Sequence, residues 1–298
     1  MKKNPEIVVA SGKGGTGKTT ISSFLITFLW KKGLSVVGVD ADVEAPDLVI
    51  ALGDHREVSR ETIIDSKVAV IDYNSCSNCG ECYKACQFNA IEWVNKPIVI
   101  QELCEGCGVC SYVCPEKAIK MKLVETGDLI VYETKYAPIV TGELRIGRKH
   151  SGKLVEMLRE RAGKIRNEGL VIIDAAAGTG CPVISSIVGA DYLIIVVEPT
   201  PQSLRTAGKI ADIGNFFNTA MGVVVNKYDL NPSFVQHVKK WANERKIEFL
   251  GQVPYDENVV RAYVNAKSLL EYAPNSPATK SLEKILNAWF EKLFEEEA

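Results

Sequence analysis

The sequence predicts an α/β fold: a doubly wound, mostly parallel sheet with a small α+β domain inserted into it. Two observations support this prediction. Short continuous runs of Val, Ile and Leu alternate with helical segments in the first and last parts of the chain, as expected for parallel strands that are buried on both faces. A cysteine-rich stretch interrupts this alternation. We therefore expect the main domain to comprise residues 1–65 and 123–298, and the inserted domain residues 66–122.

The main domain begins with a predicted strand, loop, helix and second strand at residues 7–10, 11–18, 19–32 and 35–39. Gly33 follows the helix as an expected C-cap, because glycine adopts the left-handed conformation there without strain. After the insertion, strands are expected at residues 129–132, 170–173, 192–197, 221–225 and 249–250. Helices are expected between them at residues 152–166, 203–215 and 232–245.

The composition is typical of a globular protein with a core, since 46% of the 298 residues are hydrophobic and 24% are charged. The formal net charge is -2 and no basic stripe is present, which argues against nucleic acid as a partner. No apolar run is long enough to cross a bilayer, so stable membrane insertion is not expected. The first apolar run ends in a glycine-rich loop instead of a cleavage site, so we expect a cytoplasmic protein.

Two identical C-x2-C-x2-C-x3-C runs contain eight of the nine cysteines: Cys76, Cys79, Cys82 and Cys86, then Cys104, Cys107, Cys110 and Cys114. Each run is followed by an Ala-Ile pair, so the insertion is an internal repeat, with short strands expected at residues 68–71, 98–100 and 119–121. Such runs in a long chain without an export signal indicate metal ligation rather than a disulfide framework. Zinc is the alternative metal, although its sites use C-x2-C pairs.

Residues 12–19 fit the phosphate-binding pattern G-x-x-x-x-G-K-[ST], between a predicted strand and a predicted helix. In this pattern backbone N–H groups surround the phosphates, Lys18 reaches the β- and γ-phosphates, and the Thr19 hydroxyl binds Mg²⁺. We therefore expect ATP or ADP with Mg²⁺, and the alternative is a chance glycine-rich turn. The residues expected to contact the nucleotide in this loop are Gly12, Lys13, Gly14, Gly15, Thr16, Gly17, Lys18, Thr19 and Thr20.

A second lysine, Lys13, gives the order Lys-Gly-Gly-x-Gly-Lys-Thr. This order resembles the deviant Walker A signature of the MinD/ParA/Mrp/nitrogenase-iron-protein superfamily of ATPases. The resemblance covers residues 1–65 and 123–298. It implies that Lys13 reaches the nucleotide of a partner subunit, that ATP holds a homodimer face to face, and that hydrolysis is slow. A solvated lysine is the alternative for Lys13.

Further positions match this superfamily. Asp42, after the second strand, is implied to orient the attacking water, with Asp40 in that role or an N-cap role for Asp42 as alternatives. Asp174 resembles the Walker B aspartate, which reaches Mg²⁺ through water, and Gly178 the glycine that senses the γ-phosphate. The chain has Asp-Ala-Ala-Ala-Gly where the Mrp-type branch has Asp-x-Pro-Pro-Gly. Losing both prolines makes this switch more flexible.

The same resemblance implies a binding site for the base. Asn226, in Asn-Lys-Tyr-Asp after a strand, is implied to contact the adenine edge. Pro254 begins Pro-Tyr-Asp, which resembles the second loop on the adenine side, and a plain turn is the alternative there.

The two cysteine runs resemble those of a bacterial ferredoxin with two [4Fe–4S] clusters. The resemblance implies a crossed assignment, because the fourth cysteine of each run binds the other cluster. The first cluster would take Cys76, Cys79, Cys82 and Cys114, and the second Cys104, Cys107, Cys110 and Cys86. Pro115 follows Cys114 as in that family, whereas Gln87 follows Cys86 and is a departure.

Three segments give weaker signals. Cys181 lies after the switch glycine, where it resembles the cluster-bridging cysteine of nitrogenase iron protein, but a small buried residue at the start of a helix is favoured. Residues 142–152 are rich in Gly and Arg and are either a partner or switch-linked loop or a solvated connector. Apolar residues at helical spacing from Leu282 to Phe294 are expected to dock on the sheet rather than on a membrane.

Together these features predict an ATPase that couples Mg-ATP-dependent dimer switching to electron transfer through two [4Fe–4S] clusters. An iron–sulfur carrier or scaffold of the Mrp type is the first alternative, and a nucleotide-dependent, redox-sensing interaction switch is the second. The redox partner or cluster acceptor is not identified by the sequence.

Overall fold

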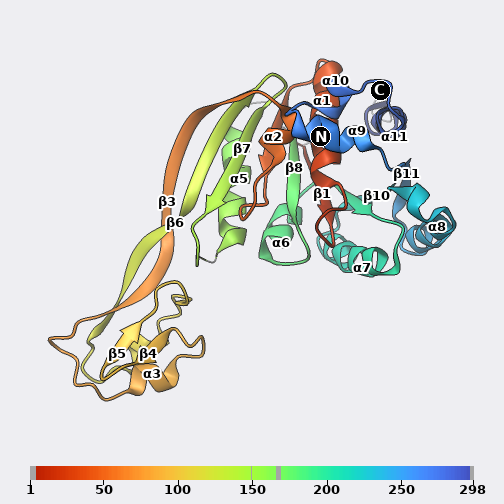
Figure 1. The fold of residues 1–298 in the computed structure, drawn as a ribbon. Helices are drawn as coiled ribbons and strands as arrows, with labels where there is room; N and C mark the ends of the chain where they lie inside the picture. The colour runs from red at the N-terminus through yellow and green to blue at the C-terminus, as the bar shows by residue number, and fades with distance from the viewer. Residues whose placement is uncertain (1–4, 149, 166–168, 296–298) are drawn as a thin grey trace. The chain divides into compact units, whose positions relative to one another are not determined.

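The computed structural model describes residues 5–148, 150–165 and 169–295 (Figure 1). The chain divides into two compact units. The first comprises residues 1–60, 130–142 and 152–298, and the second residues 61–129 and 143–151.

Nine strands form one sheet in the order β11-β10-β9-β1-β8-β2-β7-β6-β3. Strand β1 pairs in parallel with β8 and β9, β2 with β7 and β8, and β10 with β9 and β11. The strands of the first unit are β1 (Glu6–Ser11), β2 (Val36–Asp40), β7 (Pro138–Leu144), β8 (Leu170–Ala177), β9 (Tyr192–Val197), β10 (Ala220–Asn226) and β11 (Glu248–Val253).

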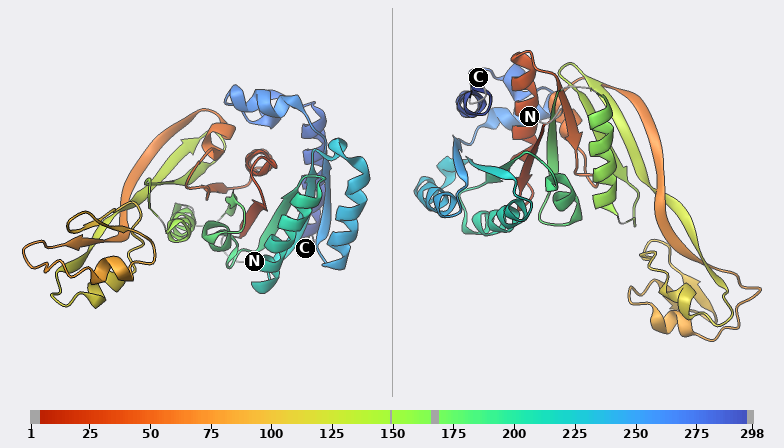
Figure 2. Two further views of the ribbon diagram at one scale, coloured as in Figure 1. Left: turned by 60° about the horizontal axis from the view of Figure 1, so that its bottom comes forward. Right: turned by 180° about the vertical axis from the view of Figure 1, so that it is seen from behind.

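The central strands are mostly apolar and buried because helices cover both faces of the sheet. Ile7 and Val9 of β1 belong to a core that includes residues of α1 and α11, whereas Val8 and Ala10 alternate with them and are also completely buried. Figures 1 and 2 show the two helix layers. One contains α1 (Lys18–Lys31), α2 (Leu48–Leu52), α9 (Glu257–Val264), α10 (Leu269–Tyr272) and α11 (Pro277–Glu295). The other contains α5 (Ser151–Ile165), α6 (Cys181–Ile187) and α7 (Pro201–Phe216).

Helix α8 (Val235–Glu244) packs beside β10 and β11, after the short 3-10 turns η1 (Tyr228–Leu230) and η2 (Pro232–Phe234). The C-terminal helix α11 packs against β11 and α1, with Leu282, Ile285, Leu286 and Trp289 buried in the core. Its apolar face therefore docks on the sheet. No helix among the described residues has the length and apolarity needed to cross a bilayer.

The second unit is built on β3 (His55–Ile71) and β6 (Ile119–Thr134), both of which continue from the first unit. It adds an antiparallel hairpin of β4 (Ile91–Trp93) and β5 (Pro97–Val99) and two short helices, α3 (Glu81–Ala85) and α4 (Val109–Val113). The core of this unit is small: Ala69, Ile71, Ile91 and Ile119 pack with Cys82 and Cys110.

The strands expected at residues 68–71 and 119–121 are the ends of β3 and β6 rather than separate short strands. The predicted limits 65/66 and 122/123 consequently fall inside two continuous strands. The first half of β3 escaped prediction because its side chains are mostly polar and exposed, so it has no apolar periodicity.

Candidate functional site

The phosphate loop connects β1 to α1. Gly15 and Gly17 have left-handed φ angles of 75° and 95°, which favour glycine. A Cβ atom on Gly17 would also lie 2.3 Å from Nδ2 of Asn226. Asn226, at the end of β10, donates from this nitrogen to the Thr16 carbonyl at 2.8 Å. The loop is thus closed against the end of a neighbouring strand, and a side chain at position 17 would open it.

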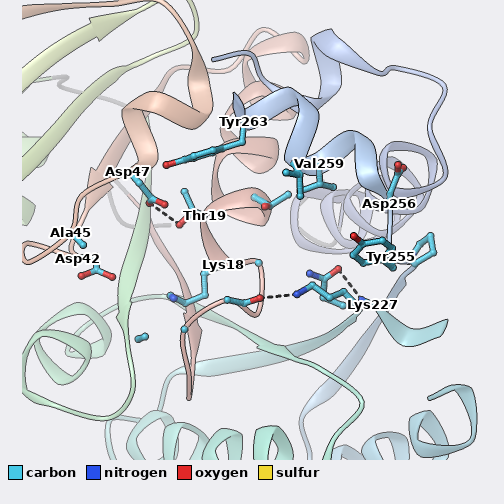
Figure 3. Close-up of a pocket in the computed structure, with 18 residues that line it drawn as sticks. Lys18, Thr19, Asp42, Ala45, Asp47, Lys227, Tyr255, Asp256, Val259 and Tyr263 are labelled. Atoms are coloured by element: carbon cyan, nitrogen blue, oxygen red, sulfur yellow. Dashed lines mark hydrogen bonds between the residues drawn. The ribbon is translucent and has the colours of Figure 1, made fainter. Parts of the chain in front are cut away.

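A cavity of about 440 Å³ lies beside this loop in the first unit (Figure 3). Its predicted lining residues are Gly14, Gly15, Gly17, Lys18, Thr19, Thr20, Asp42, Asn226 and Pro254. Other lining residues were not named as site residues: Ala45, Asp47, Ala177, Val259, Val260 and Tyr263, together with Lys227, Tyr255 and Asp256 of the two motifs expected on the adenine side. Gly12, Lys13, Thr16, Asp174 and Gly178 are not among the lining residues. The cavity lies where parallel strands end and α1 begins, which is where phosphates bind in such folds.

A group of carboxylates lies around the start of α1. The Thr19 hydroxyl donates to Asp47 at 3.0 Å, and the Ser22 hydroxyl donates to Asp174, at the end of β8, at 2.8 Å. Burial raises the pKa of Asp174 to about 7, although the Lys18 cation opposes this shift. Thr19 and Asp174 therefore both have hydrogen-bonded oxygen atoms near the start of α1, and their binding of Mg²⁺ stays a prediction.

Asp40 has a structural role in this arrangement. Its carboxylate accepts from the backbone N–H groups of Asp42 at 3.1 Å, Asp47 at 2.8 Å and Leu48 at 2.9 Å. It is 1% exposed, and burial followed by the nearby charge of Asp174 raises its pKa. Asp40 therefore shapes the loop that presents Asp42 and Asp47 to the cavity. The role of Asp42 in orienting water stays a prediction.

Lys13 is held within its own chain. It forms an ion pair with Glu198, whose carboxylate also pairs with Lys227 at 2.8 Å. The Lys227 ammonium donates to the Gly15 carbonyl at 2.8 Å as well. Burial raises the pKa of the Glu198 carboxyl, but the hydrogen bonds from Lys13 and Lys227 lower it by more, so the net pKa is lowered. To reach a partner subunit, Lys13 would have to leave Glu198.

The opposite wall of the cavity combines aromatic and aliphatic side chains. Tyr255, Val259 and Tyr263 lie along the loop after β11 and along α9 (Figure 3). The Tyr255 N–H donates to Asp229 at 2.7 Å, which links this loop to the turn after β10. Asn226 also lines the cavity, but its amide nitrogen is bonded to the phosphate loop. Its contact with an adenine edge stays a prediction.

Sequence reasoning missed Asp47, Glu198 and Tyr263. Glu198 follows β9 directly, and ligands in such sheets gather at the carboxyl ends of strands, so a signal for it was available. Asp47 is the third aspartate in the eight residues that start at Asp40, the last residue of β2, yet only the fold shows that it faces Thr19. Tyr263 lies on α9, which had no predicted boundary.

The switch residues lie at the end of β8. Gly178 has a left-handed φ of 100°, and its N–H donates to the carbonyl of Ser11 at 3.0 Å. Cys181 starts α6 with Pro182 next to it, as expected, but it is exposed rather than buried. The expectation of burial was wrong because α6 begins directly after the exposed Gly180, outside the apolar layer between helices and sheet.

Two cavities in the second unit separate its eight cysteines into two sets of four. One cavity is lined by Cys76, Cys79, Cys82 and Cys114. The other is lined by Cys86, Cys104, Cys107 and Cys110. Among the described residues, no three His, Cys, Asp or Glu side chains are arranged to hold a single metal ion. In a cluster each thiolate binds a different iron atom, so the relevant observation is which cysteines surround one cavity.

The two halves of this unit repeat in backbone conformation. Gly80 and Gly108 precede α3 and α4 with φ angles of 79° and 77°, and both short helices end at a cysteine. Three residues beyond that cysteine, Asn89 and Lys117 have φ angles of 51° and 49°. This equivalence follows from the identical spacing of the two runs.

Side chains around the two cavities differ. Phe88 and Val109 line the second cavity and are 45% and 43% exposed, whereas Glu116 stands at the position equivalent to Phe88 in the first. Backbone N–H groups donate to sulfur at Cys86 (3.3 Å) and Cys104 (3.5 Å) of the second set. In the first set such a bond is formed at Cys114 (3.3 Å).

Comparison with known proteins identifies the family of the chain. A family model described as the CobQ/CobB/MinD/ParA nucleotide binding domain matches residues 7–269. The chain belongs to this family. The predicted α/β fold and the resemblance to the MinD/ParA ATPases are therefore confirmed at the level of family and fold.

Proteins similar to this chain match nearly its entire length. A protein of Methanocaldococcus jannaschii is 32% identical over 292 residues, covering 97% of this chain and 96% of that protein. The cell division ATPase MinD of Pyrococcus furiosus superposes with a TM-score of 0.58 at 18% identity, covering 97% of this chain and 99% of that chain. The septum site-determining protein MinD of Pyrococcus horikoshii, complexed with Mg-ADP, has a TM-score of 0.56 at 16% identity and covers 98% of both chains.

Proposed function

We propose that this chain of the CobQ/CobB/MinD/ParA family binds and slowly hydrolyses Mg-ATP as a homodimer, and couples this cycle to electron transfer through two [4Fe–4S] clusters. The observation that carries the proposal is the sorting of eight cysteines into two cavities, four in each. That sorting agrees with the crossed ligand sets expected for two clusters. The donor set fits, since four thiolates surround each cavity and backbone N–H groups are directed at three of the sulfurs.

In the nucleotide site, Lys18 and the phosphate loop would bind the β- and γ-phosphates, and Thr19 would hold Mg²⁺ with Asp174 behind a water. Asp42 lines the same cavity and would orient the attacking water. ATP and water give ADP and phosphate. Lys13, released from Glu198, would stabilise the negative charge of the partner subunit's nucleotide.

In the second unit, Cys76, Cys79, Cys82 and Cys114 would hold one cluster, and Cys86, Cys104, Cys107 and Cys110 the other. Each bound cluster supplies one-electron storage. Hydrogen bonds to sulfur raise a cluster's reduction potential. One carboxylate lines each cavity, Glu116 the first and Glu105 the second. Two backbone N–H groups donate to sulfur in the second set and one in the first, so the second set would hold the cluster of higher potential.

The test is anaerobic purification followed by iron and sulfide analysis and an EPR redox titration with and without Mg-ATP. We expect about eight iron atoms per chain and a reduction potential that changes with nucleotide. A matched control is Cys181→Ser, the one cysteine outside both sets, which is expected to keep the full iron content. A chain that binds ATP and contains no iron would contradict the electron-transfer function.

The exposure of Cys181 beside the switch loop favours a second candidate, an iron–sulfur carrier or scaffold. A carrier needs a labile site that a recipient protein can reach. If Cys181→Ala abolishes nucleotide-dependent transfer of iron to an apo-ferredoxin while the eight-cysteine clusters stay intact, the carrier function is supported. Unchanged transfer would remove it.

A further inference from the structure

Residues 145–148, called here the linker, lie between β7 and α5 but pack within the second unit. The backbone N–H of Arg145 donates to the Thr126 carbonyl of β6 at 2.9 Å. Its guanidinium pairs with Asp128 at 3.1 Å and with Glu125 at 3.4 Å. The start of the linker is thus fixed to β6 by both backbone and side chain.

The end of the linker contacts the residues that lead into the second cysteine run. Gly147 has a left-handed φ of 72°, and an added Cβ atom would lie 2.8 Å from Cβ of Glu102 and 3.0 Å from its Cα. Arg148 donates from Nη1 to the Gln101 carbonyl at 3.2 Å. Cys104, two residues after Glu102, belongs to the second set of four cysteines. The linker therefore fixes the backbone immediately before a predicted cluster ligand.

Four residues after Arg148, the chain reaches Gly152, the second residue of α5, in the first unit. A Cβ atom on Gly152 would lie 2.9 Å from the Ser185 hydroxyl and 3.1 Å from Cβ of Cys181, so α5 and α6 are in close contact there. Farther along α5, Arg159 donates to the Ser185 carbonyl. Because these contacts are tight, a displacement of α6 must displace the start of α5.

Helix α6 begins directly after the switch loop, residues 178–180. Gly178 is bonded to the carbonyl of Ser11, which immediately precedes the phosphate loop. In P-loop ATPases the γ-phosphate and its Mg²⁺ order such loops, and hydrolysis releases them. The switch loop, α6 and the start of α5 are thus in contact within the first unit, and the linker contacts residues 101 and 102 within the second unit.

We infer that the linker transmits the nucleotide state of the phosphate loop to the backbone at residues 101–104, and so to the cluster site of Cys104. The inference rests on the proposed function, because a cluster must occupy the second set. Contacts of the linker are distinct from the residues proposed to bind or hydrolyse ATP. Changing it should leave both ATP binding and the iron content intact.

The test is hydrogen exchange, monitored by mass spectrometry, on the iron-loaded protein with Mg-ADP or with Mg²⁺ and a non-hydrolysable ATP analogue. In the wild type, amide exchange in the peptide of residues 99–106 should differ several-fold between the two nucleotides. Arg148→Ala, which removes the bond to Gln101, should abolish that difference. Gly147→Asn should do the same, because Asn tolerates the left-handed backbone but its Cβ displaces Glu102.

The matched control is Arg56→Ala, which removes an exposed arginine from a pair with Glu133 at 2.8 Å and leaves the linker intact. It should keep the wild-type difference. The inference is overturned if both linker variants keep that difference, or if the phosphate-loop peptide responds to the analogue while residues 99–106 do not. An iron-free chain would overturn the cluster function together with this inference, and the iron assay distinguishes that outcome from the others.

Discussion

The buried carboxylate of Asp174 makes a prediction about pH and stability that needs neither ATP nor iron. Asp174 is 1% exposed, and burial raises its pKa from the ordinary value of 3.8 to about 7. Between these two values the folded protein binds more protons than the unfolded chain. The stability contributed by the protonated group is therefore fully present below about pH 4, decreases as the pH rises, and is absent above about pH 7.

Asp174→Asn removes this dependence because the amide stays neutral at every pH. The amide oxygen still accepts the hydroxyl of Ser22, so the packing is retained. The difference between 3.8 and about 7 corresponds to about 4 kcal/mol. Part of this free energy belongs to the interaction between Asp174 and Asp40, whose pKa is raised by burial and by Asp174. We expect the variant to be more stable than the wild type by about 2–4 kcal/mol at pH 8 and by little at pH 4.

The assay is hydrogen exchange of the slowest amides in β1 and β8, with EDTA present and no nucleotide, from pH 5 to pH 8. These amides report the unfolding free energy of the first unit alone. Asp212→Asn is the matched control, since Asp212 forms an exposed pair with Arg245 at 2.7 Å. The reasoning fails if Asp174→Asn is no more stable than the wild type at pH 8, or if its advantage is the same at pH 5.

Three further predictions concern the two sites and the core. Asp42→Asn should slow ATP hydrolysis by about 100-fold or more with ATP affinity retained, and equal losses of rate and affinity in phosphate-release and binding assays would contradict its role. Because the ligand sets are crossed, Cys86→Ser and Cys110→Ser should both affect the second cluster and leave the same residual EPR spectrum, whereas Cys82→Ser should affect the first cluster and leave a different one. A match between the spectra of Cys86→Ser and Cys82→Ser would refute the crossing. Leu286→Ala should destabilise the first unit by about 2–5 kcal/mol in urea unfolding, since Leu286 is 2% exposed in the core, and a loss below 1 kcal/mol would show that α11 is not needed.

Much of the first unit follows from local sequence. The strands at residues 7–10, 170–173 and 192–197 were predicted because each is a continuous apolar run. The structure extends the first by two residues and the second by four, and it matches the limits of the third. The phosphate loop was predicted because its glycines and lysine occur in a fixed local pattern. Such features depend on neighbouring residues only, so a single sequence contains them.

Long-range contacts escaped prediction. Asn226 closes the phosphate loop through Thr16, 210 residues away, and Glu198 pairs with a lysine at position 13. Neither pairing has a local signature. The linker is a similar case: glycine and arginine marked it as unusual, but only the fold shows that Gly147 and Arg148 meet residues 101 and 102.

Strands β3 and β6 have a consequence for changes in the length of the inserted sequence. They are neighbours in the sheet and lead into and out of most of the second unit, so the ends of the inserted sequence are held side by side. Closing a loop costs little entropy when its two ends are already paired, and that cost grows only slowly with loop length. Lengthening or shortening the cysteine-rich segment between β3 and β6 should therefore cost the nucleotide-binding sheet little stability. The same ribbon is a natural place to graft other small domains onto this ATPase.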